Sequence, residues 1–181
     1  MRVLGLERGT VKLMEHQKEW EVNAKDIIKL LKKLLKDIAI DIQHIGSTAI
    51  PTIHSKPIID IVIGVCNIND IIPNIKLLEQ NNIIYRGEDV PGQLLFAMGN
   101  FESNIITHHI HIVIWNEENW INYINFRDYL NTFKEKALFY DCQKQKLAQQ
   151  FYNNRMKYTE NKRELINQLI NEASKWKSSI L

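Results

Sequence analysis

The spacing of hydrophobic residues predicts one amphipathic helix followed by a strand-rich segment. Between Trp20 and Ile38 apolar residues recur every three or four positions with lysines between them, which is typical of a helix with one buried side. Isoleucine-rich or alternating patterns then predict strands over residues 38–45, 58–65, 93–98 and 105–115. A helix is expected from Asn67 or Asn69 to about Gln80, a turn or short strand at 83–86, and a loop at 87–92.

The remainder of the chain has helical spacing. Tyr, Phe, Leu and Ile recur with that period near residues 117–131, 134–152 and 155–177. We therefore expect an α+β fold in which residues 1–116 form an α/β core and residues 117–181 form a helical cap. The two parts are expected to pack as a single compact unit.

Composition places the chain among ordinary globular proteins. It has 181 residues, 45% hydrophobic and 24% charged, which suits one domain with a substantial core. No apolar run approaches the ~20 residues that cross a bilayer, and the N-terminus lacks the apolar segment of a signal peptide, so a cytoplasmic protein without membrane contact is expected. Cys66 and Cys142 have no metal-ligand spacing and are expected to be reduced thiols.

Charge is unevenly distributed along the chain. The net charge is only +2, which argues against a dedicated nucleic-acid-binding protein. Residues 134–181 nevertheless contain 10 basic and 5 acidic residues, whereas the preceding residues are net acidic. This distribution suits a phosphorylated ligand held between the two parts, and a solvated helix surface with a chance excess of lysine is the alternative.

Polar residues within two apolar strands point to a metal site. Side chains alternate between the two faces of a strand, so Asp60 lies opposite Ile59 and Ile61 and should leave the buried face. The same alternation places His109 and His111 on one face of the later strand. If the two strands share a sheet, one carboxylate and two imidazoles project together and could bind Zn²⁺, Mn²⁺ or, less typically, Mg²⁺. The alternative is an Asp60 paired with Lys56 beside ordinary half-buried histidines.

A turn between the first two strands is a candidate phosphate site. In Gly46-Ser47-Thr48 the glycine lets backbone N–H groups approach an anion, and the two hydroxyls add donors. Lys56 could neutralise the phosphate. Most turns of this kind are only turns, but a Gly-Ser turn followed about 13 residues later by a strand carboxylate, here Asp60, is typical of the nucleotidyltransferase superfamily.

Several ordered motifs resemble the GrpB family of nucleotidyltransferase-fold proteins. They are His-Ile-Gly-Ser-Thr-Ala-Ile-Pro at 44–51, Lys-Pro-Ile-Ile-Asp-Ile at 56–61, Thr-His-His-Ile-His at 107–111 and Phe-Arg-Asp-Tyr-Leu at 126–130. Tyr140, Lys144, Tyr158 and Lys162 are similar to residues of the helical tail of that family. The resemblance extends over about residues 10–174.

The resemblance implies a fold and a set of site residues. The fold would be a nucleotidyltransferase-like mixed sheet with helices packed on one face, a metal-dependent nucleotide site on the other, and a C-terminal helical cap. Gly46 and Ser47 would hold phosphates, and Asp60 with His109 and His111 would hold a divalent metal. Glu88 is a further candidate ligand.

Two positions depart from the expected pattern. Val62 stands where nucleotidyltransferases generally have a second carboxylate, which two-metal chemistry requires. Ile106 replaces a basic residue expected before the Thr-His-His run, and one phosphate contact is lost with it.

Three further residues are weaker candidates for nucleotide contacts. Arg127 could bind a phosphate with its two-pronged guanidinium, or it could pair with Asp128. Tyr158 and Lys162 lie four residues apart on one predicted helix face and could contact the base and the phosphates, or they could serve packing and surface charge.

These observations lead to a ranked set of functions. The first is a metal-dependent nucleotidyltransferase that uses Asp60, a nucleoside triphosphate, Mg²⁺ or Mn²⁺ (or Zn²⁺), and an unknown small-molecule or protein acceptor. The second is a non-catalytic nucleotide or small-ligand binding module. The third is a phosphohydrolase, since His109 and His111 echo the alternating histidines of histidine-triad hydrolases, with Val113 at the third position. A purely structural role is disfavoured, because an aspartate within an isoleucine strand is costly to desolvate without a partner.

Overall fold

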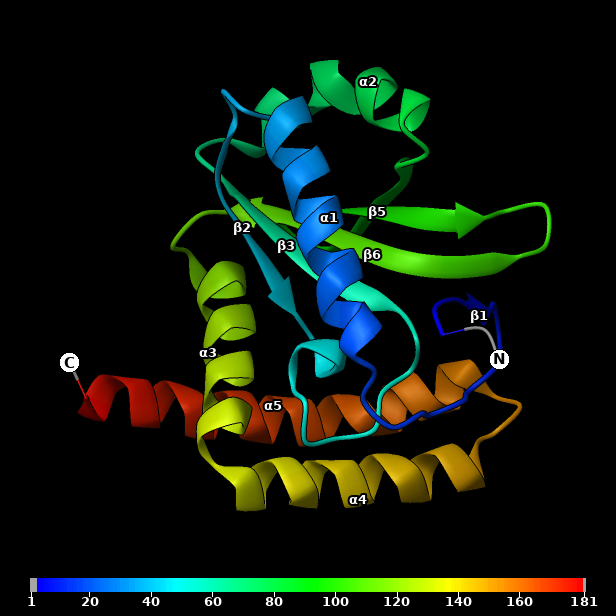
Figure 1. The fold of residues 1–181 in the computed structure, drawn as a ribbon. Helices are drawn as coiled ribbons and strands as arrows, with labels where there is room; N and C mark the ends of the chain where they lie inside the picture. The colour runs from blue at the N-terminus through cyan, green and yellow to red at the C-terminus, as the bar shows by residue number, and fades with distance from the viewer. Residues whose placement is uncertain (1–2, 181) are drawn as a thin grey trace.

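The computed structural model describes residues 3–180, which form a mixed sheet with helices around it (Figure 1). The five longer strands lie in the order β2-β3-β6-β5-β4, and the two-residue β1 pairs with β6. The strands are β1 (Leu6–Glu7), β2 (Ala39–Ile45), β3 (Ile59–Val65), β4 (Ile84–Val90), β5 (Gln93–Asn100) and β6 (Ile105–Ile114). The helices are α1 (Lys18–Leu34), α2 (Ile75–Gln80), α3 (Glu118–Thr132), α4 (Lys134–Gln150) and α5 (Arg155–Ser179).

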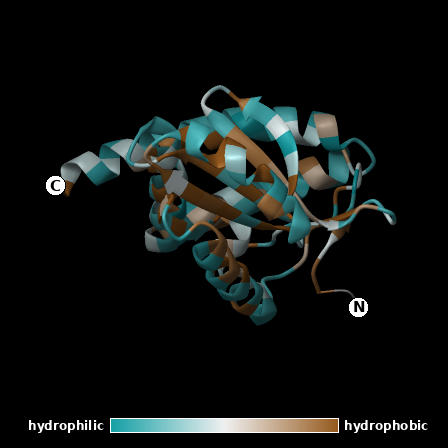
Figure 2. Ribbon diagram, turned by 90° about the horizontal axis from the view of Figure 1, so that it is seen from above, coloured by the Kyte–Doolittle hydropathy of each residue, from teal (hydrophilic) through white to brown (hydrophobic). Residues whose placement is uncertain are grey.

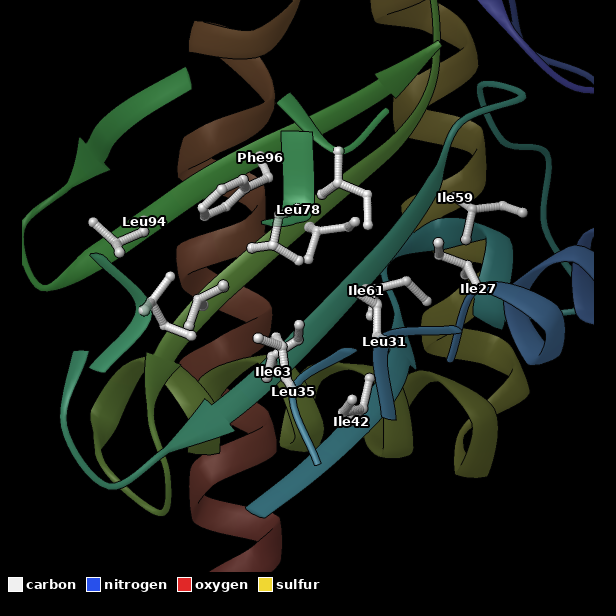
Figure 3. Close-up of a cluster of buried hydrophobic side chains, with 14 of the residues drawn as sticks. Ile27, Leu31, Leu35, Ile42, Ile59, Ile61, Ile63, Leu78, Leu94 and Phe96 are labelled. Carbon is white, nitrogen blue, oxygen red and sulfur yellow. The ribbon is translucent and has the colours of Figure 1, made fainter. Parts of the chain in front are cut away.

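One face of the sheet is covered by α1 and α2 and forms the main core. Ile59, Ile61 and Ile63 of β3 are fully buried there. They pack with the apolar stripe of α1, including Ile27 and Leu31 (Figure 3). In the hydropathy colouring the central strands are mostly brown, whereas the surrounding helices show teal stretches (Figure 2). The alternation predicted for β3 is therefore confirmed.

The pairing of β3 with β6 aligns the polar residues of the opposite face. These two strands are parallel neighbours, with Asp60 beside His109 and Val62 beside His111. Farther along this face, Val62 and Val113 pack under Trp120 of α3. The sheet therefore leaves its polar residues together at one end of an otherwise apolar surface.

The three C-terminal helices form a second core. Phe126 of α3, Tyr140 of α4 and Leu169 of α5 lie in one buried cluster. Ile50 and Ile53, from the connection between β2 and β3, belong to the same cluster. The helical part thus packs directly against the chain that follows the Gly46-Ser47 turn.

The segment after residue 83 differs from the prediction. The expected loop at 87–92 is mostly strand, because β4 continues to Val90 and pairs with β5. Irregular pairing between Tyr85 and Gly87, and again between Glu88 and Val90, interrupts the alternation that identifies a strand in the sequence. β5 also continues to Asn100, two residues beyond the strand predicted at 93–98. β1 is too short to produce a pattern.

None of the helices within residues 3–180 is both long enough and apolar enough to cross a membrane.

Candidate functional site

Asp60 is the centre of the polar cluster on β3 and β6. Its Oδ1 lies 3.2 Å from Nδ1 of His109 and 3.8 Å from Nε2 of His111. Burial alone would raise the pKa of Asp60. The hydrogen bond with His109 and the charge of the two imidazoles outweigh burial and hold this pKa well below its usual range. Asp60 is therefore an ionised carboxylate at neutral pH.

Gly46 brings the backbone of the turn directly against Asp60. Its φ is +70°, in the region that side chains disfavour, and a Cβ at this position would collide with Oδ2 of Asp60. Ser47 then begins a short 3-10 helix, Ser47–Ala49. The glycine is required here for both backbone conformation and space, so the turn and the carboxylate form one site.

Gly46→Ala is expected to move Asp60 as well as strain the turn. The positive φ should cost about 1–3 kcal/mol in the free energy of unfolding, measured by urea denaturation. Because the added methyl group occupies the place of Oδ2, binding of a metal and an anion should also fall by at least about tenfold, measured by calorimetry. Gly92→Ala is a matched control, since Gly92 also has a positive φ but no atom lies near its missing Cβ. Normal binding by Gly46→Ala would contradict this role of the glycine.

Lys144 of α4 reaches the same turn from the helical part. Its Nζ donates to the carbonyl oxygen of His54 at 2.5 Å and lies 3.4 Å from Oγ of Ser47. The residue is only 1% exposed. Burial and the positive charges of Lys162 and Lys56 lower the pKa of Lys144 to about 7, despite the carboxylate of Asp141 at 3.8 Å.

Two more lysines complete a lysine cluster, defined here as Lys56, Lys144 and Lys162. The Nζ atoms of Lys56 and Lys162 lie 5.3 and 5.5 Å from the centre of the Tyr158 ring. Burial and the charges of Lys162 and Arg155 lower the pKa of Lys56 to about 7. Burial also opposes charge on Lys162, but Tyr140, Tyr158 and Asp60 outweigh it and raise its pKa. An anion among these ammonium groups would relieve their mutual repulsion.

A second network fixes the loop that carries Lys56. Asp141 of α4 accepts from the backbone N–H of His54 at 2.9 Å and lies 2.8 Å from its Nδ1. Gln145 donates to the same carboxylate at 2.9 Å. These contacts attach the connection between β2 and β3 to α4. They hold Lys56 and Lys144 close to the Gly46-Ser47 turn.

Most of the predicted site residues lie close together in the structure. Tyr158 lies among them, but its ring contacts lysines instead of being open to a nucleotide base. Gly46, Ser47, Asp60, His109 and His111 converge as the sequence predicts. Lys56 and Lys162 lie beside them, and Lys56 points to the ring of Tyr158 instead of pairing with Asp60. Tyr158 is only 1% exposed, so its ring supports two lysines and is not open for stacking with a base.

Three predicted residues are not brought into the site. Thr48 is buried, and its hydroxyl lies 2.9 Å from Nε2 of His44. Arg127 is engaged by Asp128 at 2.7 Å and donates to Gln43 and to the carbonyl oxygen of His44, so it joins α3 to β2.

Glu88, predicted as a further metal ligand, is the third residue that lies outside the site. It lies on the edge strand β4, separated from β3 by β6 and β5, and accepts from the backbone N–H of Gly92 at 2.7 Å.

Lys144 is a candidate site residue that the sequence pattern does not identify. Its position in a helical segment gives no sign that it faces the turn, because α4 has polar residues on all sides. The only signal was its place in the family-like tail. The third position of a histidine triad, Val113, is fully buried against Val62 and Ile45, so that alternative gains no support.

The donor set around Asp60 fits a cation whose remaining ligands come from elsewhere. One carboxylate oxygen between two imidazole nitrogens suits Mn²⁺ or Zn²⁺ better than Mg²⁺, which prefers oxygen. Over residues 3–180, however, no three His, Cys, Asp or Glu side chains are grouped closely enough to enclose an ion.

Comparison with known proteins identifies the family. A family model described as GrpB protein matches residues 10–172. The chain belongs to the GrpB family. The glutamate-rich protein GrpB of Alkalihalophilus pseudofirmus is 32% identical over 173 residues, covering 94% of this chain and 99% of that protein. YqkA of Bacillus subtilis is 30% identical over 92% of this chain, but this chain spans only 48% of YqkA.

Solved structures confirm the fold. The crystal structure of the conserved protein GrpB from Enterococcus faecalis has a TM-score of 0.83 and 28% identity, over 91% of this chain and 98% of that one. The Cid1 poly(U) polymerase with MgGTP bound has a TM-score of 0.54 at 11% identity, over 75% of this chain and 44% of that one. This GrpB-family chain therefore has the predicted nucleotidyltransferase-like mixed α/β fold.

Proposed function

We propose that this GrpB-family protein binds a nucleoside triphosphate with a divalent cation and transfers the nucleotidyl group to an acceptor. The observation that supports this most is the convergence of three features from distant parts of the chain. The Gly46-Ser47 turn, the ionised Asp60 and the lysine cluster meet at one end of the sheet. A turn with donors, a carboxylate and several ammonium groups are what a metal-bound polyphosphate requires.

Each group has a distinct part in the proposed reaction. Ser47 and the lysine cluster bind the β- and γ-phosphates and neutralise them, while Asp60 with His109 and His111 holds the cation. When bound, the cation withdraws charge from the phosphate under attack. An acceptor oxygen forms a bond to the α-phosphorus and releases its proton to water. The bond from that phosphorus to the bridging oxygen breaks, and pyrophosphate leaves among the lysines.

The reaction is tested by pyrophosphate release from each of the four nucleoside triphosphates with Mg²⁺, Mn²⁺ or Zn²⁺ and a panel of acceptors. We expect release that depends on both cation and acceptor and that is lost in Asp60→Asn. A matched control is Asp26→Asn, an exposed carboxylate on α1. Release that persists in Asp60→Asn would contradict the proposal.

A non-catalytic nucleotide-binding module is the second candidate, and one observation favours it. Val62, where a second carboxylate would stand, is fully buried under Trp120. The site therefore offers a single carboxylate on β3 for two-metal chemistry. Metal-dependent nucleotide binding with no product from any acceptor would select this candidate over the transferase.

The affinity for the nucleotide should depend on the charge of Lys144. With a pKa of about 7 in the free protein, Lys144 loses its proton as the pH rises above 7, so it then binds an anion less well. Lys144→Arg keeps its charge throughout this range. We expect the ratio of native to Lys144→Arg affinity, measured by calorimetry from pH 6.5 to 9, to fall as the pH rises. The ratio also cancels titration of the nucleotide itself, and a constant ratio would contradict the assignment.

A further inference from the structure

A cavity of about 760 Å³ lies beside His109, on the side of Asp60 where β6 and β5 follow β3 in the sheet. Across the sheet the register runs from Asp60 to His109 and on to Ala97. His109 and Ala97 form part of the cavity wall. The Gly46-Ser47 turn follows β2, on the other flank of β3. Asp60 thus stands between the Gly46-Ser47 turn and this cavity.

The cavity is lined by arginines from three separated parts of the chain. Arg8 follows β1, Arg86 lies on the edge strand β4, and Arg155 and Arg163 lie on α5. The start of α5 and β1 lie on the same side of the molecule (Figure 1), and the backbone N–H of Val11 donates to the carbonyl oxygen of Tyr152 at 3.3 Å. The fold therefore brings four arginines from distant parts of the chain to the wall of one cavity.

These arginines are not used in ion pairs. Among the described residues, none of the four makes a salt bridge or a side-chain hydrogen bond, although Arg86 lies over the ring of Phe101 at 5.7 Å. Arg127 provides the contrast, because it is fully engaged by Asp128, Gln43 and a backbone carbonyl. The lining includes one carboxylate, that of Glu160. Half-buried Arg155 has its pKa lowered by burial and by the charge of Arg8.

We infer that this cavity is the acceptor site of the proposed transfer reaction and takes a small molecule with at least two phosphate or carboxylate groups. This inference rests on the proposed function, since only a donor nucleotide on the other side of Asp60 makes the bound molecule an acceptor. Guanidinium groups recognise such anions through paired hydrogen bonds. The cavity has the volume of a small-molecule site. Its arginines line this cavity and do not form an extended basic surface, which favours a small molecule over a nucleic acid.

Calorimetry with citrate, fructose 1,6-bisphosphate and orthophosphate tests the cavity, in the full chain. We expect at least one of the two multiply charged probes to bind at least tenfold more tightly than orthophosphate. Arg155→Gln and the more exposed Arg163→Gln should each weaken that binding about tenfold or more. Lys157→Gln, an exposed residue of the same helix outside the cavity lining, is the matched control and should bind normally. Arg163→Gln keeps the test informative if Arg155→Gln does not fold.

Several outcomes would overturn the inference. The first is that neither multiply charged probe binds. The second is that Lys162→Gln weakens probe binding as much as the arginine variants do, which would place the probe in the lysine cluster. The third is that a single-stranded oligonucleotide binds in preference to both probes and depends on the same arginines. Nucleotide binding is measured on the same variants to separate the two proposals. Nucleotide binding without probe binding contradicts only the cavity, whereas probe binding in the cavity without any nucleotide binding contradicts the proposed function and with it the acceptor role.

Discussion

Replacing Asp60 with asparagine is expected to abolish metal-dependent nucleotide binding, with a loss of at least about 100-fold in affinity measured by calorimetry with Mn²⁺ and a nucleoside triphosphate. The side chain keeps its shape, but it loses the negative charge that attracts the cation. The two neighbouring imidazoles cannot replace this charge. Because the low pKa of Asp60 keeps the native carboxylate ionised at any pH where the protein would be tested, the loss should be independent of pH from 6 to 9.

The stability of the same variant provides its control. The contacts of Asp60 with the two histidines are partly exposed, so the free energy of unfolding should fall by only about 1 kcal/mol. Asp60 has a lowered pKa in the folded state, so its contribution is present above the unfolded pKa and disappears as the pH falls through the folded pKa. If Asp60→Asn does not fold, its binding says nothing about the charge of Asp60. Binding by Asp60→Glu is then compared with that of the native protein instead. Unchanged metal-dependent binding in a folded Asp60→Asn variant would contradict the role of this residue.

Lys144→Met is expected to weaken nucleotide binding without lowering the stability of the fold. The substitution keeps the length and apolar stem of the buried side chain and removes its charge, so affinity for a nucleoside triphosphate should fall about 100-fold. At pH 7 the melting temperature should stay equal to or rise above that of the native protein. The reason is that the pKa of Lys144 is about 7 in the folded state and about 10.5 in the unfolded chain. As the pH falls from 10.5 to 7, the unfolded chain takes up a proton more readily than the folded protein, so the folded state is destabilised, and this destabilisation reaches its full size below about pH 7.

Lys146→Met is the matched control, because this lysine lies on the same helix and is exposed. It should change neither affinity nor melting temperature appreciably. If Lys144→Met bound the nucleotide as well as the native protein, the lysine cluster would not be the phosphate site. A large loss of stability would mean that the contact with the His54 carbonyl outweighs the burial of charge.

Strong periodicity is what made the central fold predictable. The alternation of β3 and β6 identified both faces of the sheet, because a buried isoleucine face is a clear signal at period two. The same alternation predicts that Asp60, His109 and His111 share one face if their strands lie in one sheet, and β3 and β6 are indeed neighbours. The edge strand β4 was shortened in the prediction, because its irregular pairing at Gly87 breaks the period and its residues are mostly exposed.

Residues whose roles depend on contacts between distant segments were harder to predict. Lys144 reaches Ser47 across 97 positions of the chain, and nothing in its local pattern shows this. Arg127 stands in a family-like motif, yet its neighbours in space, Gln43 and Asp128, occupy it. Glu88 has the right chemistry for a metal ligand but lies on the wrong strand. Local sequence therefore predicts the faces of strands, whereas partners across the fold emerge only from its packing.

The most direct test of the proposed site is a crystal structure with Mn²⁺ and a nucleoside triphosphate that cannot be cleaved between its α- and β-phosphates. We expect anomalous scattering from Mn²⁺ at Asp60, with terminal phosphates beside Ser47 and Lys144. A nucleotide bound elsewhere, or Mn²⁺ at Asp60 with no phosphate beside the Gly46-Ser47 turn, would contradict the proposed site.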